Sequence, residues 1–357
     1  MRCSATSSSK GHPSRQTVVE WLLCLLVLGG WSAVQAYAGE QPMLHPPRLQ
    51  PGDTIMFVAP AGDLDEDRML LAKRRLEARG YHVKMRDDLF AREGYLAGSD
   101  DRRAEELMQA FLDPEVQAIF PGTGGYGTMR ILDRLDYEAI RAHPKILIGF
   151  SDITGLHLAL NRKSGLATYH TPSPMWGLGS QEGLTPFSRQ YFYRAITAAA
   201  HGTYRVETPA GVPQPIALGK GRVRGRLIGG NLSLISALEG TAYAIDTHEA
   251  ILLLEDTREA PYRIDRMLRQ LLLAGKLKTL RGAVLGQFTR TDSREDQLTE
   301  DKQYSVDGIL RQYFVPLGIP VLMNFPVGHH PMNASLPIGG QVEIDADRAT
   351  LSILEEE

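Results

Sequence analysis

The chain has 357 residues, 43% of them hydrophobic and 23% charged, which is the composition of an ordinary globular protein with room for two domains. Its net charge of −3, without a basic stripe carrying interleaved aromatic residues, argues against a nucleic-acid binder. Both cysteines, Cys3 and Cys24, lie in the N-terminal leader, so the remaining chain offers no disulfide, thiolate zinc site or cysteine nucleophile.

Residues 1–38 have the three parts of a secretory signal peptide. The first part is basic, with Arg2, Lys10 and Arg15. The second, Trp21–Trp31, is an apolar run shorter than the about 20 residues that a transmembrane helix needs. The third is the small-x-small pattern Ala36-Tyr37-Ala38 before Gly39. We therefore predict an exported, periplasmic protein whose leader is removed, with an uncleaved N-terminal membrane anchor as the alternative.

The chain from residue 39 to 208 alternates between expected strands and helices. The strands are apolar runs at 54–59, 81–85, 116–120 and 146–148. The helices are amphipathic segments at 65–79, 100–112, 128–135 and from 153 onward, followed by one at 187–200. This alternation predicts an α/β domain with a parallel sheet that is covered on both faces.

A proline-rich segment, 209–219, is expected to link this domain to a C-terminal β/α domain, 220–357. The second domain should contain strands at 221–228, 250–254 and 282–288 and helices at 262–274 and 306–314. A charged loop is expected at 289–303 and a terminal hairpin at 341–354.

The stretch Lys145–Leu160 predicts a strand, a sharp turn and a helix, with Ser151 in the turn. A serine there lies at the carboxyl end of a buried strand and at a helix amino terminus, where backbone N–H groups and the helix dipole favour negative charge. A nucleophile beside a developing oxyanion needs that environment. Serine is also a preferred N-cap, so a plain helix start is the alternative.

A glycine-rich loop with Gly122, Gly124 and Gly127 matches G-x-G-x-x-G between a strand and a helix. A dinucleotide site is disfavoured, because this is the third strand and no acidic residue ends a strand about 20 residues later. An exported protein also lacks easy access to nicotinamide cofactors. The loop can instead point backbone N–H groups at an oxyanion, or it can be a tight turn.

Two acidic residues, Glu255 and Asp256, end a very apolar strand, which is where α/β proteins place ligands. Such a carboxylate can orient a histidine. The alternative is an exposed strand end or an ion pair with Arg258 or Arg263.

Histidines 329 and 330 lie in a loop flanked by glycine and proline, where an imidazole can serve as a general base. A metal site with Glu255 and Asp256 is disfavoured, because no His-x-x-x-His spacing supports it. A surface-loop histidine is the alternative. His170 either faces the cleft or packs in the core. The candidate serine, glutamate and histidine together have the composition of a nucleophilic hydrolase, although G-x-S-x-G is absent.

Seven segments, in the same order, resemble the LD-carboxypeptidase family, serine peptidases of the S66 type that include microcin-immunity peptidases. They are FVAPAG (57–62), YLAG (95–98), GGYG (124–127), ILIGFSDIT (146–154), LIGGNLS (227–233), LLLEDTREAPYRIDR (252–266) and FPVGHHPMN (325–333). The resemblance extends from about Gly52 to the C-terminus.

The resemblance implies a flavodoxin-like N-terminal domain and a swivelling-type C-terminal β/α domain, with the active site between them. Ser151 would be the nucleophile, Glu255 and His329 its partners, and the Gly125 and Asp152 N–H groups the oxyanion donors. Tyr126, His170 and Asn231 are expected to contact substrate. No metal or cofactor is expected. A homodimer is expected, because family members are often dimers. One residue departs from the family: Thr123 stands where an arginine is common.

The function implied is hydrolysis of the L,D amide bond of a murein tetrapeptide, with release of its terminal D-alanine. A microcin-immunity-type hydrolase of a peptidyl-nucleotide and a non-catalytic muropeptide-binding protein are the alternatives.

Overall fold

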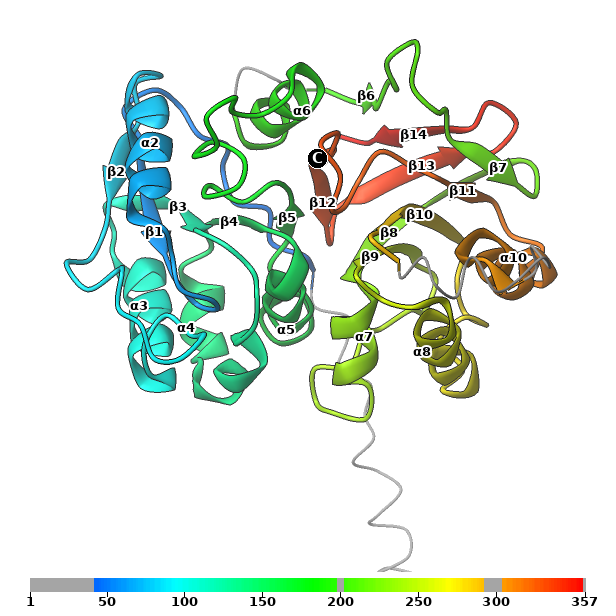
Figure 1. The fold of residues 1–357 in the computed structure, drawn as a ribbon, viewed down its shortest axis with the longest axis horizontal. Helices are drawn as coiled ribbons and strands as arrows, with labels where there is room; N and C mark the ends of the chain where they lie inside the picture. The colour runs from blue at the N-terminus through cyan, green and yellow to red at the C-terminus, as the bar shows by residue number, and fades with distance from the viewer. Residues whose placement is uncertain (1–41, 198–201, 292–303, 356–357) are drawn as a thin grey trace, which may run out of the picture. The chain divides into compact units, whose positions relative to one another are not determined.

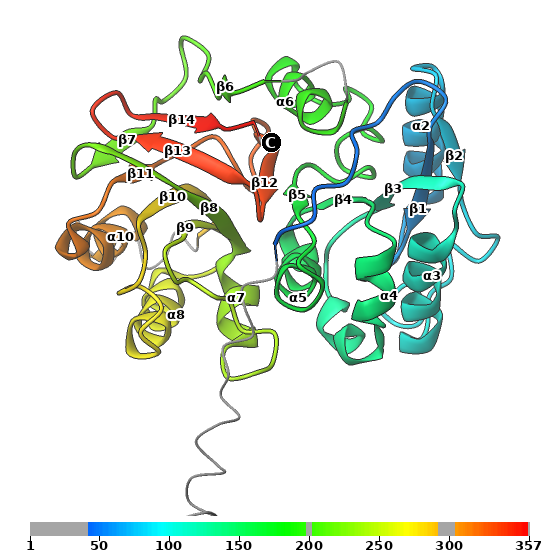
Figure 2. The ribbon, with the colours of Figure 1, turned by 180° about the vertical axis from the view of Figure 1, so that it is seen from behind.

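The computed structural model describes residues 42–197, 202–291 and 304–355. The predicted signal segment, 1–38, and most of the predicted charged loop lie outside the described residues. Among the residues described, no helix has the length and apolar character needed to cross a bilayer. Residues 43–357 contain two β-sheets, shown from opposite sides in Figures 1 and 2. The division into domains at 209–219 stays a prediction.

The first sheet has six strands in the order β12-β5-β4-β3-β1-β2. Five of them are mutually parallel, as the alternating pattern predicts: β1 Thr54–Val58, β2 His82–Lys84, β3 Val116–Pro121, β4 Ile146–Gly149 and β5 Thr168–His170. The sixth, β12 (Leu336–Ile338), comes from near the end of the chain and pairs antiparallel with β5. Figures 1 and 2 both show β12 beside β5. The sheet that begins at Thr54 is therefore completed by residues far along the sequence.

Helices cover both faces of this sheet, because successive strand residues point to opposite sides. Met56 and Val58 share a core with α3 (Asp100–Leu112), α4 (Tyr137–Ala142) and α5 (Thr154–Ser164). Ile55 and Phe57 pack instead with α2 (Glu66–Glu77) and α6 (Pro186–Ile196).

One predicted helix is wrong. Residues 128–135 form two short 3-10 turns, η1 Thr128–Arg130 and η2 Leu132–Arg134, rather than the start of an α-helix. Thr128 donates both its backbone N–H and its hydroxyl to Asp152, and these tertiary bonds occupy the start of the segment. Tertiary hydrogen bonding has here outweighed local helix propensity.

The second sheet has eight strands in the order β6-β14-β13-β8-β9-β10-β11-β7. Its parallel centre consists of β8 Arg222–Asn231, β9 Ile251–Thr257, β10 Gly282–Thr289 and β11 Val321–Met323. The antiparallel flanks are β6 Tyr204–Arg205, β14 Thr350–Ile353, β13 Gln341–Asp345 and β7 Ile216–Leu218. The segment predicted as a linker thus contributes strand β7, while the predicted terminal hairpin is present as β13 and β14.

Helices α7 (Leu232–Leu238), α8 (Pro261–Leu273) and α10 (Val306–Phe314), with the 3-10 turn η5 (Val315–Leu317), lie on one face of the second sheet. The opposite face packs with β12 and with Phe187 and Tyr191 of α6. Helix α5 of the first sheet contacts both α7 and β8, so one hydrophobic cluster continues between the two sheets. The shared core brings the carboxyl ends of β4, β8 and β9 toward one another.

Candidate active site

Ser151 lies in a strained turn between β4 and α5. Its φ angle is 61°, in the left-handed region that an L-residue enters at a cost of about 1–2 kcal/mol. A one-turn 3-10 helix, η3 (Ser151–Ile153), follows directly and leads into α5. The side chain is half-buried. A serine on a sharp, strained strand-to-helix turn is the geometry of a nucleophile elbow, here without the G-x-S-x-G pattern.

The glycine-rich loop packs directly on this turn. A Cβ atom on Gly124 would lie 3.0 Å from both the Ser151 Cβ and the Asp152 amide nitrogen, so only glycine allows this approach. The loop is secured by a hydrogen bond from the Gly62 N–H to the Gly124 carbonyl, 3.1 Å. Gly125 follows with a positive φ of 94°. The loop thus packs Gly124, the residue before Gly125, against the Ser151–Asp152 backbone.

A fully buried arginine, Arg103, binds the glycine-rich loop at Gly127. Its guanidinium donates to the Gly127 carbonyl at 2.9 Å and to the Pro60 carbonyl at 2.6 Å, and it is paired with Asp100. A charged residue on an amphipathic helix gives no signal of burial in the sequence, so Arg103 was missed. Its hydrogen bonds fix two loop carbonyls at once.

Asp152 turns its carboxylate away from the turn and into the protein. Its Oδ2 accepts the Thr128 N–H at 2.8 Å, and its own carbonyl accepts the Thr128 hydroxyl at 2.7 Å. Burial raises the pKa of Asp152, and the hydrogen bonds from Thr128 partly offset this effect. The residue therefore ties the Ser151 turn to the glycine loop through its side chain.

Glu255 and His329 are joined by a short polar contact. Glu255 ends the apolar part of β9 and is completely buried, and its Oε2 lies 2.6 Å from Nδ1 of His329. Burial alone would raise the pKa of Glu255, but the neighbouring imidazoles of His170 and His329 overcome this effect and lower it to about 2. An ionised carboxylate only accepts, so Nδ1 of His329 must carry the proton and its Nε2 is left as an acceptor.

The alternative for these acidic residues, an exposed strand end, is wrong, since both Glu255 and Asp256 are buried.

Close approach of the histidine loop to Glu255 depends on Gly328, where a Cβ would lie 2.7 Å from Oε2 of Glu255. The Gly328 N–H donates to Asn333 Oδ1 at 3.0 Å, and Thr289 donates to the His329 carbonyl at 3.1 Å. These bonds fix the backbone on which the imidazole is mounted.

Phe150 connects the histidine to the serine turn. Its ring centroid lies 4.8 Å from that of His329, and Phe150 immediately precedes Ser151 in the chain. The side chain of His329 keeps 20% of its surface exposed, so the imidazole is reachable from solvent. His330, its neighbour, instead accepts the Met332 N–H with its own Nδ1 at 3.2 Å. Of the two loop histidines, only His329 contacts both Glu255 and the serine turn.

Asn231 and Asp256 form a hydrogen-bonded pair next to the carboxylate of Glu255. The Asn231 side-chain amide donates to Asp256 Oδ1 at 3.0 Å and, at 3.4 Å, to Glu255 Oε1. Asp256 also accepts the backbone N–H and the hydroxyl of Ser233, at 2.9 and 2.7 Å. Burial, reinforced by the nearby Glu255 charge, raises the pKa of Asp256 to about 6 despite these bonds. Both polar groups of Asn231 are thus engaged within the protein, as its Oδ1 caps α7.

The predicted substrate-contacting residues differ in their surroundings. Tyr126 is 48% exposed at the tip of the glycine loop, edge-on to Tyr95 with ring centroids 5.6 Å apart. His170 is completely buried on β5, with Nε2 3.9 Å from Glu255 Oε1. At Thr123, where the family commonly has arginine, the hydroxyl accepts the indole N–H of Trp176 at 3.0 Å. Trp176 is 57% exposed and lies under the guanidinium of Arg68, 4.4 Å from the ring centroid.

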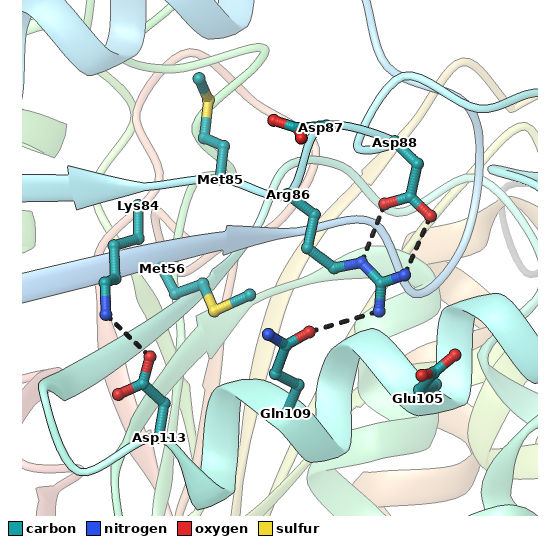
Figure 3. Close-up of a pocket in the computed structure, with 9 residues that line it drawn as sticks. All are labelled: Met56, Lys84, Met85, Arg86, Asp87, Asp88, Glu105, Gln109 and Asp113. Carbon is teal, nitrogen blue, oxygen red and sulfur yellow. Dashed lines mark hydrogen bonds and ion pairs between the residues drawn. The ribbon is translucent and has the colours of Figure 1, made fainter.

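A polar groove of about 560 Å³ lies elsewhere, between the end of β2 and the exposed side of α3 (Figure 3). Four of its ionic groups pair with one another, Arg86 with Asp88 and Lys84 with Asp113. None of the predicted site residues lines it. Within the ranges that the structure describes, no three His, Asp or Glu residues are grouped so as to hold a metal ion.

Comparison with known proteins identifies the family of the chain. Residues 55–171 match the LD-carboxypeptidase N-terminal domain, and residues 224–344 match the LD-carboxypeptidase C-terminal domain. The chain is 37% identical to the probable murein peptide carboxypeptidase of Bacillus subtilis strain 168, over 86% of this chain and 93% of that protein. It is 32% identical to the murein tetrapeptide carboxypeptidase of Pseudomonas aeruginosa, over 82% and 94% of the two chains.

A solved structure of MccF in complex with glutamyl sulfamoyl guanosine is similar, with a TM-score of 0.78 and 26% identity. That match covers 88% of this chain and 99% of MccF. Two domain matches in the expected order, and relatives aligned over nearly their whole length, place this chain in the LD-carboxypeptidase family.

Proposed function

We propose that this protein is a serine-type LD-carboxypeptidase that removes the terminal D-alanine of murein tetrapeptides. Ser151 is the nucleophile, His329 the general base and acid, and Glu255 the carboxylate that orients His329. The observation that carries the proposal is the 2.6 Å contact between His329 Nδ1 and a buried, ionised Glu255. It leaves Nε2 of His329 free to accept a proton beside the strained Ser151 turn.

In the first step, Ser151 Oγ attacks the carbonyl carbon of the amide while its proton passes to His329 Nε2. The imidazolium that forms is stabilised by Glu255, which stays ionised because its pKa is about 2. The C–N bond then breaks, His329 returns the proton to the leaving amine, and D-alanine departs. Water repeats the sequence on the acyl-enzyme and regenerates Ser151.

The negative charge of the tetrahedral intermediate requires donors. The backbone N–H groups of Gly125 and Asp152 are assigned this role, because Gly124 packs against the Ser151 turn and brings both backbones beside it. Loss of one such donor costs about 3–4 kcal/mol of transition-state stabilisation in comparable hydrolases. The start of α5 adds its dipole at the same point.

The substrate class is taken from the murein peptide activities named for the relatives. The bond cut is the amide between diaminopimelate and D-alanine. Tyr126 at the loop tip is assigned to contact the peptide, as it is exposed beside the serine turn. Export across the membrane through residues 1–38 would bring the enzyme to this substrate in the periplasm, and fractionation of cells expressing the full chain and a chain without those residues tests that part.

The test is mass spectrometry of defined muropeptides after incubation with the protein. Wild type should convert the tetrapeptide to the tripeptide and release D-alanine, and Ser151→Ala should release none while remaining folded. Ser352→Ala, a half-buried serine on β14, serves as the matched control and should keep full activity. Dialysis against EDTA should leave activity intact, because the mechanism uses no metal. Full activity of Ser151→Ala would refute the assignment.

A second candidate is favoured by the likeness to MccF, whose structure holds glutamyl sulfamoyl guanosine. On this alternative, the same Ser151 chemistry cleaves an aminoacyl amide of a nucleotide conjugate. Incubating the protein with a murein tetrapeptide and with an aminoacyl sulfamoyl nucleoside separates the two functions. Tight binding of the tetrapeptide without turnover would instead indicate a non-catalytic muropeptide-binding protein.

A further inference from the structure

We propose that His170 is a positioning residue that donates its Nε2–H to Oε1 of Glu255 and so holds the carboxylate in place for His329. The inference rests on the proposed function of Ser151, Glu255 and His329. It gives His170 a different role from substrate contact, since the side chain is completely buried.

The first observation is an unpaired imidazole. Neither ring nitrogen of His170 makes a hydrogen bond within the part of the chain that the structure describes, although the side chain has no exposed surface. A neutral imidazole always carries one N–H, and a buried donor without an acceptor is costly. The acceptor that faces it is Glu255 Oε1, 3.9 Å from Nε2. Hydrogen bonds at such sites are often long in the absence of substrate and tighten when it binds.

The second observation is the uneven occupation of the two Glu255 oxygens. Oε2 makes the 2.6 Å contact with His329, whereas among the described residues the one hydrogen bond to Oε1 is the 3.4 Å contact from Asn231. A carboxylate held by one oxygen can rotate about its last bond, and rotation would swing Oε2 away from His329. A donor on Oε1 prevents this, and His170 is the group placed to supply it.

The third observation is the position of His170 in the fold. It ends β5, pairs with Gly149 of β4 and lies opposite Leu336 of β12. Glu255 belongs to β9 of the other sheet. Phe150 packs against both histidines, with ring centroids 5.7 Å from His170 and 4.8 Å from His329. A bond from His170 to Glu255 therefore ties the carboxylate to the strand pair that carries Ser151.

The ionised carboxylate of Glu255 favours an N–H on the ring nitrogen of His170 that faces it. On β9, Glu255 is ionised and Asp256 has its pKa raised to about 6 by burial. From α5, His157 binds the Gly149 carbonyl and has its pKa lowered to about 3 by burial, so it is neutral. His329 faces the other oxygen of Glu255. Glu255 is the charged group that the structure places beside Nε2 of His170, and the proposed bond satisfies its carboxylate.

The experiment compares His170→Gln, which keeps an amide donor at the reach of Nε2, with His170→Met, which has none. Removing a hydrogen bond to a charged group should lower kcat of His170→Met by about 10- to 100-fold at unchanged KM. His170→Gln should recover most of this loss. The acid limb of the kcat/KM profile should move to higher pH in His170→Met, because the whole carboxylate charge then acts on His329. Thr168→Val, two residues away on β5, is the buried control and should match wild type.

A measurement on wild type covers the case in which His170→Met does not fold. Nitrogen-15 spectra of histidine-labelled protein should report His170 as the neutral Nε2–H tautomer at pH 7. An Nδ1–H tautomer, or kcat and pH profile of His170→Met equal to those of Thr168→Val, would overturn the inference. Failure of the proposed function is distinct, because it would appear as full activity in Ser151→Ala or as an inactive wild type.

Discussion

Gly328→Ala tests whether the short contact between Glu255 and His329 sets the rate. The added Cβ would lie 2.7 Å from Oε2 and 2.8 Å from Cβ of Glu255. Carbon atoms pack at about 3.5–4.0 Å, so the histidine loop or the glutamate must retreat by about 1 Å. A displacement of this size at a catalytic group can cost about 100-fold in rate. We therefore expect kcat for D-alanine release to fall by about two orders of magnitude.

The same substitution should reduce the free energy of unfolding by two additive effects. Alanine at the Gly328 φ of 107° costs about 1–2 kcal/mol, and overpacking against Glu255 costs about 1–3 kcal/mol more. Gly52→Ala is the matched control, because Gly52 has a φ of 95° and no atom within 4 Å of the added Cβ. It should show only the backbone cost, with normal kcat. Urea unfolding and steady-state kinetics of both variants give the comparison, and equal losses in the two would refute the reasoning.

Three further predictions concern the groups around the site. Asp256, whose pKa burial raises from 3.8 to about 6, binds a proton in the folded state that it loses when unfolded, so stability should fall by about 3 kcal/mol as pH rises from about 3 to 7. Urea unfolding of wild type and Asp256→Asn at these two pH values measures the fall, which the variant should lack. An equal change of unfolding free energy with pH in the two proteins would contradict the prediction. Arg103→Met should cost about 2–5 kcal/mol, because it leaves two buried carbonyls without their donor while Asp100 keeps its pairing with Arg130, against at most about 1 kcal/mol for the exposed Arg134→Met. Phe150→Leu should lower kcat by about 3- to 10-fold at constant KM, because it loses an aromatic contact with His329, and an unchanged kcat would count against that contact.

Helices with a clear cap and an amphipathic pattern could be predicted almost to the residue. Ser99 accepts the Arg102 N–H, and α3 runs over Asp100–Leu112, as the sequence indicates. The parallel first sheet also follows from alternation of apolar strands with such helices. The turns at 128–134 could not be predicted, because the partner of Thr128 is Asp152, 24 residues away.

Some residues of the candidate site could likewise be predicted from the sequence, and others could not. Residues at strand ends and in glycine-flanked loops, Ser151, Glu255 and His329, are recognisable from local pattern and from the family resemblance, and the structure brings the latter two into contact. The surroundings of His170 could not be predicted, because alternation shows that a strand residue is buried but not which side chain of another sheet it faces. Burial of Arg103 was missed for a related reason, since the carbonyls that it binds belong to a separate loop.

Strand β12 has a consequence for how this protein can be made. The last strand of the sheet that presents Ser151, Leu336–Ile338, follows strands β6 to β11 of the second sheet in the chain. During synthesis, β5 therefore keeps an open edge until strands β6 to β11 of the second sheet have been made, and an open edge is a site for wrong pairing. A shortened chain lacking β12 would contain Ser151 but would lack the last strand of the sheet that presents it. Completion of the sheet that presents Ser151 thus depends on prior synthesis of most of the second sheet.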